Sequence, residues 1–229
     1  RVGGSPYEFY GLQADGVYAT QAEADKANLV NSSMQAYQAG DVRFIDQNND
    51  GRIDIKDRIS LGSAAPDYFG GFYTNFRYRH FALSAEFAYS KGNKAYNAVR
   101  RTLESASSFS NQSVAVSNRW SVEGQVTDMP RATFGDAIGN NNFSSRWIED
   151  ASYLRIKNIT LSYNFDKPIW NFFRSGTIYV TGENLLTATK YLGLDPEFAY
   201  SSSDNATQGF DYAKVMQPKS VKLGINLKF

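Results

Sequence analysis

Residues 46–57 carry oxygen-bearing side chains at the spacing of a calcium-binding loop. Gly51 stands at the sixth position, where such a loop must turn sharply, and Arg52 would lend its backbone carbonyl at the seventh. Ca²⁺ takes roughly six to eight hard oxygen ligands, and this spacing wraps them around one point. The segment therefore predicts a Ca²⁺ site whose side-chain ligands are Asp46, Asn48, Asp50, Asp54 and Asp57.

Two features of this loop depart from the helix–loop–helix calcium site. Asp57 stands where a longer, bidentate glutamate is usual, and residues 42–45 before the loop read as a strand rather than a helix. A turn rich in Asn, Asp and Gly can also use its side chains to cap its own backbone. The sequence leaves both interpretations open.

No other segment offers a set of catalytic groups. The chain has no cysteine, and His80 is its only histidine, placed between two strand-like runs. A lone histidine near a turn is most often a solvated surface group. The 24 basic and 23 acidic residues nearly cancel, without a basic stripe that would favour nucleic acid. We therefore expect neither an enzyme nor a nucleic-acid-binding protein.

Alternating apolar and polar residues indicate the elements that position these groups. In the last segment Val221, Leu223 and Ile225 share one face, and Lys222 and Asn226 share the other. Lengths of about ten residues suit tilted strands that cross a membrane. The pattern predicts an all-β fold, an antiparallel transmembrane β-barrel segment with strands at 70–79, 80–90, 153–165, 176–187 and 219–229.

Composition and phase add three details. Aromatic residues make up 15% of the chain, which fits a barrel with an apolar outside, although a soluble β-protein fits nearly as well. No run of about 18 apolar residues is present, so we expect no transmembrane helix. The alternation changes phase inside segment 153–165, which predicts a β-bulge near Lys157.

The lengths of the connections predict a topology. A tight turn at Arg79-His80 and a link of about ten residues after Phe165 lie on one side, and the long links 91–152 and 188–218 lie on the other. Short periplasmic turns and long external loops are typical of outer-membrane barrels. We therefore expect an extracellular loop region at 1–69, containing loop 46–57, and barrel strands with external loops over 70–229.

The number of strands predicts a missing remainder. Five strands that begin outside cannot close a barrel of an even number of strands, and open sheet edges cannot sit in lipid. The chain also begins without an initiator methionine or a signal segment. We expect the true start to lie upstream and the rest of the barrel to come from other sequence.

Several motifs resemble signatures of the SusC/RagA family of TonB-dependent transporters. The longest are the stretch from Gly40 to Tyr68, which includes the Asp/Asn loop, and the stretch from Arg146 to Leu161. Shorter matches are Gly182-Glu183-Asn184-Leu185, Leu194-Asp195-Pro196-Glu197 and the closing Gly224 to Phe229. The matches span nearly the whole chain and keep their order.

The resemblance implies an importer of oligosaccharides or peptides in the bacterial outer membrane. The family builds a barrel of about 22 strands filled by an N-terminal plug. A SusD-like surface lipoprotein covers it, and the TonB complex drives import through a segment before the plug. This chain would supply about the last quarter of the wall. Ile225, Leu227 and Phe229 resemble the family's signal for barrel assembly.

The alternation then assigns side chains to the two sides of the wall. Aromatic residues at the strand ends, Tyr78, Phe165, Trp170, Phe172 and Phe173, should mark the periplasmic girdle. Positions that should face lipid are Phe81, Leu83, Phe87, Leu161, Tyr163, Val221, Leu223 and Ile225. Positions that should face the lumen or the plug are Asn75, Arg77, Glu86, Asn158, Thr181, Glu183, Lys222 and Asn226.

The sequence also leaves three alternative interpretations of the protein open. A complete small barrel would need further strands within 1–69 and 91–152. A soluble, calcium-dependent carbohydrate-binding β-domain would pack its apolar face inside. A barrel enzyme would need a nucleophile and base, which the sequence does not offer.

Overall fold

The computed structural model describes residues 3–5, 7–165, 174–197 and 207–228. The chain divides into two compact units, each built from three separate stretches. The first unit comprises Arg1–Ala65, Lys94–Glu149 and Phe198–Lys214. The second comprises Pro66–Asn93, Asp150–Glu197 and Val215–Phe229. We refer to them as the loop unit and the sheet unit.

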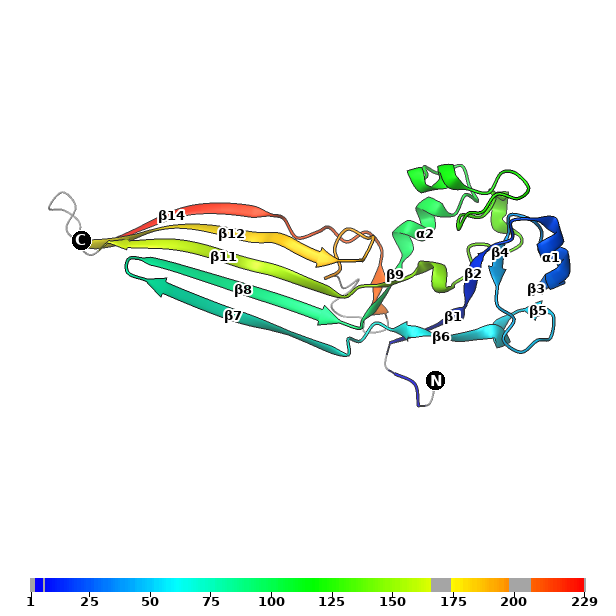
Figure 1. The fold of residues 1–229 in the computed structure, drawn as a ribbon, viewed down its shortest axis with the longest axis horizontal. Helices are drawn as coiled ribbons and strands as arrows, with labels where there is room; N and C mark the ends of the chain where they lie inside the picture. The colour runs from blue at the N-terminus through cyan, green and yellow to red at the C-terminus, as the bar shows by residue number, and fades with distance from the viewer. Residues whose placement is uncertain (1–2, 6, 166–173, 198–206, 229) are drawn as a thin grey trace. The chain divides into compact units, whose positions relative to one another are not determined.

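The sheet unit contains one five-stranded sheet in the order β14-β12-β11-β8-β7. Every neighbouring pair is antiparallel, and the long strands are visible in Figure 1. The five predicted strands are all present, with bounds Tyr68–Tyr78 (β7), Phe81–Lys91 (β8), Tyr153–Phe165 (β11), Ser175–Thr189 (β12) and Ser220–Lys228 (β14).

The pairing also confirms the predicted irregularity. The register of β11 shifts between Ile156 and Asn158 against both of its neighbours. Lys157 is the extra residue of a bulge against β8, whereas against β12 the extra residue belongs to β12, where Asn184 and Leu185 stand opposite Lys157. At the turn between β7 and β8, Tyr78 pairs with Phe81, and Arg79 adopts a positive φ of 52°. Each face of β7 therefore continues onto the same face of β8 without a register shift.

The loop unit is a set of short elements around two small cores. Its N-terminal elements are β1 (Glu8–Leu12), β2 (Ala14–Val17), α1 (Gln21–Ala27), β3 (Val30–Asn31), β4 (Val42–Phe44), β5 (Arg52–Ile53), η1 (Ile55–Asp57) and β6 (Arg58–Ser63). The later elements are β9 (Lys94–Asn97), α2 (Ala98–Glu104), η2 (Val114–Asn118), η3 (Phe134–Asp136), η4 (Ser145–Trp147), β10 (Ile148–Asp150) and β13 (Phe210–Asp211).

The two cores explain why these elements hold together. One gathers Leu12, Tyr18, Val42 and Phe44, among others, with Ile138 from the later stretch. The second packs Phe9 and Ala64 against Tyr96 and Trp147, and the Trp147 side chain is fully buried. Each core thus joins the first stretch of the chain to residues beyond 94, and apolar burial stabilises the union.

An ion pair with a buried carboxylate makes the same connection. Asp41, fully buried, accepts hydrogen bonds from Arg131 Nε at 2.8 Å and from Asn140 Nδ2 at 3.1 Å. The backbone N–H of Gln38 donates to the same carboxylate. Most of the segment predicted as external loop 91–152 is therefore packed with residues 1–65 in one unit.

Among the described residues, no helix is long and apolar enough to cross a membrane.

Candidate functional site

The sheet presents one face of exposed apolar side chains. Its register aligns Phe76, Leu83, Leu161, Val180 and Leu223 in a row across all five strands. Water-soluble proteins bury such a row, yet Phe76 is 67% exposed and Leu223 is 80% exposed. This exposure is the opposite of what the soluble-domain alternative predicts.

The neighbouring rows continue the same face. Toward the turn at 79–80, Tyr78, Phe81, Tyr163, Ile178 and Ile225 align, and the rings of Phe81 and Tyr163 lie 5.0 Å apart. In the other direction Phe72 stacks on Phe87 at 4.3 Å. By this register, all the positions predicted to face lipid lie on this one face.

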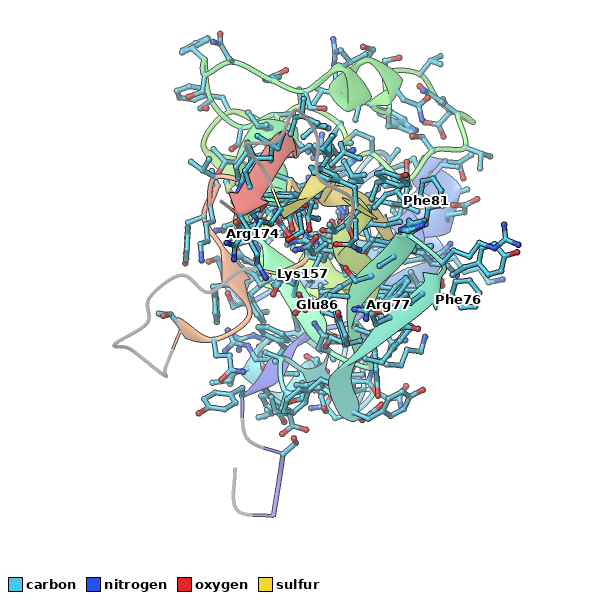
Figure 2. The ribbon with its side chains drawn as sticks, turned by 90° about the vertical axis from the view of Figure 1, so that its left-hand side faces the viewer. Phe76, Arg77, Phe81, Glu86, Lys157 and Arg174 are labelled. Carbon is cyan, nitrogen blue, oxygen red and sulfur yellow. The ribbon has the colours of Figure 1, made fainter. Side chains whose placement is uncertain are left out.

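The opposite face carries the predicted lumen positions. One row aligns Asn75, Ser84, Thr160, Thr181 and Lys222. The register places the other predicted lumen positions on the same face, namely Arg77, Glu86, Asn158, Glu183 and Asn226. Figure 2, which looks along the strands, shows Phe76 and Phe81 on one side of the sheet and Arg77 and Glu86 on the other.

Side chains on this polar face bond to one another across the strands. Lys222 Nζ lies 2.6 Å from Glu183 Oε1, and the Ser220 hydroxyl donates to the second Glu183 oxygen at 2.7 Å. The hydroxyls of Thr160 and Thr181 are 2.8 Å apart. Pairs of this kind fix the register of the strands and leave a hydrophilic surface.

A buried ionic cluster lies at one end of the polar face, and none of its residues was among the site residues predicted from the sequence. Arg155 on β11 is only 3% exposed and donates to the carboxylates of Asp195 and Glu197, which follow β12. Its Nε donates to Thr187 Oγ1 at 2.9 Å. Lys157, the bulge residue, adds a second contact to Glu197 at 2.6 Å.

Asp195 extends this cluster to a third segment. One of its oxygens accepts the backbone N–H of Glu197 and the other accepts the N–H of Gln217, just before β14. Burial, the largest single influence, raises the pKa of Asp195, but the hydrogen bonds from Arg155, Glu197 and Gln217 outweigh it, and the net pKa lies below its usual value. The ionised Asp195 carboxylate therefore connects three segments, namely β11 through Arg155, the segment after β12 through Glu197, and the residues before β14 through Gln217.

Loop 46–57 in the loop unit directs its side chains at its own backbone. Asp46 accepts the N–H groups of Asn49 and Gly51. Asp50 accepts from Arg52 N, and a hydrogen bond from the Asn48 amide is the main reason that the pKa of Asp50 is lowered. These are the contacts of the self-capping turn that the sequence left as an alternative.

Asp54 and Asp57 form a reciprocal cap at the end of the loop. Asp57 accepts from Gln47 N at 2.9 Å and from Asp54 N at 2.8 Å, and Asp54 accepts from Lys56 N. The Asp57 carboxylate is fully buried, and no lysine, arginine or histidine forms an ion pair with it in the described part of the chain. The described residues contain no group of three or more His, Cys, Asp or Glu side chains that could hold a metal ion.

The other residues singled out in the sequence are found as follows. His80 is exposed beside the Tyr163 ring, with 5.8 Å between the centroids. Ile225 and Leu227 lie in β14, and Tyr78 and Phe165 end their strands. Phe229 and the girdle residues Trp170, Phe172 and Phe173 lie outside the described residues.

Comparison with known proteins gives a consistent family. No protein-family model matches the chain. The TonB-dependent receptors P26 and P3 of Formosa agariphila are 31% and 32% identical to it, each over the whole chain. The TonB-dependent receptor SusC of Bacteroides thetaiotaomicron is 26% identical, also over the whole chain. The chain spans 23% of the length of each of these relatives.

Solved structures agree in fold. The RagAB peptide transporter matches 99% of the chain with a TM-score of 0.75 at 23% identity, over 23% of that protein's chain. The RagAB peptide importer in its open-open state matches with a TM-score of 0.72, also at 23% identity over the same shares of both chains. None of these proteins is named as an enzyme, in agreement with the prediction from the sequence that the chain is not one. Sequence and fold together identify the chain as a segment of a SusC/RagA-family TonB-dependent receptor.

Proposed function

We propose that the chain forms part of the barrel wall and of the external loops of a TonB-dependent importer in the bacterial outer membrane. The observation that carries the proposal is the two-faced sheet. Its apolar face is exposed from Phe76 to Leu223, while the opposite face is hydrogen-bonded and hydrophilic. A membrane strand needs this division, because one side meets lipid and the other meets a wet or plugged lumen.

The partners follow from the same proposal. The two outer strands of the sheet, β7 and β14, would pair with strands of the remaining barrel, because unpaired backbone groups are costly in lipid. The polar face would contact the plug. A SusD-like lipoprotein and the TonB complex would complete the importer, and its cargo would be an oligosaccharide or a peptide.

An uptake experiment on the full-length protein tests this function. Cells that produce the protein should accumulate labelled oligosaccharides or labelled peptides in the periplasm, and cells without its gene should not. A protonophore should abolish this uptake, because import through TonB uses energy from the inner membrane. Uptake that survives the protonophore would indicate a passive pore, and equal uptake without the gene would refute an import role.

We also propose that loop 46–57 binds Ca²⁺ with Asp46, Asn48, Asp50, the Arg52 carbonyl, Asp54 and Asp57 as ligands. The support is the spacing of these oxygens and the buried Asp57 carboxylate, whose hydrogen-bond partners are backbone N–H groups. A buried carboxylate without a counter-ion is unfavourable, and a divalent cation would relieve it. Carboxylate oxygens can accept an N–H and ligate a metal together, because each has more than one lone pair.

Chelation tests this proposal. For a site of the extracellular kind, with a dissociation constant of about 0.1–1 mM, about 10 mM Ca²⁺ should stabilise the protein by roughly 1.4–2.7 kcal/mol. Thermal unfolding of the full-length wild type should therefore shift upward with Ca²⁺ and return with EDTA. The Asp50→Ala variant should lose this shift, whereas Asp15→Ala, which removes an exposed carboxylate paired with Arg43, should keep it. A wild type whose thermal unfolding changes with neither Ca²⁺ nor EDTA would disprove calcium binding.

A further inference from the structure

A cavity of about 530 Å³ lies at the end of the sheet opposite the turn at 79–80. Its lining includes Tyr68 at the start of β7, Lys91 at the end of β8 and Lys190 just after β12. Tyr89 and Leu154 also line it. The register pairs Tyr68 with Lys91 and Tyr89 with Leu154, which places these side chains on the apolar face.

The cavity combines positive charge with aromatic and apolar surface. Lys91 and Lys190 are both exposed, and neither ammonium takes part in an ion pair with another described residue. One carboxylate, Asp150, also lines the cavity, and it accepts the N–H of Ser152 at 3.0 Å and its O–H at 2.5 Å. Two ammonium groups against one engaged carboxylate leave a site that favours an anion.

The position of the cavity along the strand selects the kind of anion. Phe81 begins the apolar face at the turn, and Lys91 lies ten residues further along β8. At about 3.3 Å per residue and a tilt of about 40°, this distance crosses roughly 25 Å of membrane, which is about the height of the lipid-facing band of a barrel. The cavity therefore lies at the edge of that band, at the level of lipid headgroups.

We propose that this cavity binds the phosphate-bearing headgroup of an outer-leaflet membrane lipid, an inference that rests on the proposed membrane function. Lys91 and Lys190 contact the phosphate oxygens as point charges. Tyr68 and Tyr89 pack beside the headgroup, as amphipathic rings do at a membrane surface. Leu154 contacts the first carbons of an acyl chain. A soluble phosphate fits less well, because it leaves the aromatic and apolar part of the lining uncovered.

Native mass spectrometry of the full-length protein in detergent tests the site. The probes are monophosphoryl lipid A and the same lipid without its phosphate. The wild type should bind the phosphorylated lipid more tightly. The double variant Lys91→Gln/Lys190→Gln should lower its affinity for that lipid by roughly tenfold to thirtyfold, because each surface lysine contributes about fivefold to the affinity for an anionic headgroup. The variant's affinity for the dephosphorylated lipid should not change.

A matched control separates the site from general surface charge. Lys228→Gln removes an exposed lysine from the other end of the same sheet and should leave lipid binding unchanged. Equal binding of both lipids by the wild type, or an unchanged double variant, would overturn the site while the importer assignment stands. Displacement of the bound lipid by millimolar inorganic phosphate would overturn the lipid as its ligand. A wild type that is soluble without detergent would instead overturn the membrane function.

Discussion

Replacement of Leu223 with arginine is expected to prevent most of the full-length protein from assembling in the outer membrane. Leu223 is 80% exposed on the apolar face, in the row shared with Phe76 and Leu161. If that face meets lipid, the guanidinium must enter hydrocarbon at a cost of about 2–4 kcal/mol near the midplane. The amount of protein in outer-membrane fractions, and its unfolding by urea in lipid vesicles, measure the effect.

The control places the same residue on the other face of the same strand. Asn226 pairs with Thr177 and lies on the polar side of the sheet, so Asn226→Arg should assemble at close to wild-type levels. Two equally abundant, equally stable variants would mean that the apolar face does not contact lipid, and the barrel topology would have to be abandoned.

Substitution of Arg155 by leucine is expected to destabilise the full-length protein by about 3–5 kcal/mol. The reason is the Asp195 carboxylate, which would stay buried with only the backbone N–H groups of Glu197 and Gln217 as partners. A buried charge without its partner costs much more than the intact pair contributes. The free energy of unfolding, from a urea titration in detergent, gives the value.

A double variant distinguishes loss of the pair from loss of packing. Arg155→Leu with Asp195→Leu removes both buried charges and should recover most of the lost stability, because apolar pairs of similar volume often replace buried ion pairs at little cost. A single variant within about 1 kcal/mol of the wild type would show that the cluster does not hold these segments together.

The same cluster has a defined pH dependence. Because the pKa of Asp195 is lower in the folded protein than its usual value, its contribution is complete above the usual carboxyl pKa of about 3.9. The contribution is lost as the pH falls through the lower, folded pKa. In Arg155→Leu, burial would dominate and raise the folded pKa of Asp195 above its usual value. The cost of the unpaired carboxylate is then fully present above that raised pKa and is relieved as the pH falls through it, so the stability difference between the variant and the wild type should shrink toward acid pH.

The sheet was predictable from sequence because its pattern is local. Alternation over Val221, Leu223 and Ile225 specifies both a strand and its apolar face, and the phase change near Lys157 specifies the bulge. Antiparallel pairing then carries each face from strand to strand without further information. For this reason the predicted lipid and lumen positions separate cleanly onto two faces.

The loop unit and the ionic cluster were not predictable in the same way. Asp41 and Arg131 are 90 residues apart, and nothing periodic connects them. Arg155 and Asp195 both lie in motifs that resemble the family's, yet each motif read alone shows only a charged residue. No pattern in the sequence joins them, because pairing of β11 with a strand on each side covers its backbone edges and not the face on which Arg155 lies.

The long separation of Asp41 from Arg131 has a consequence for biogenesis. The fully buried Asp41 carboxylate meets its partner Arg131 only when a segment of 90 residues has closed. Closure of so long a segment is slow compared with pairing of adjacent strands. The loop unit is therefore expected to complete its packing after the neighbouring strands of the sheet have paired.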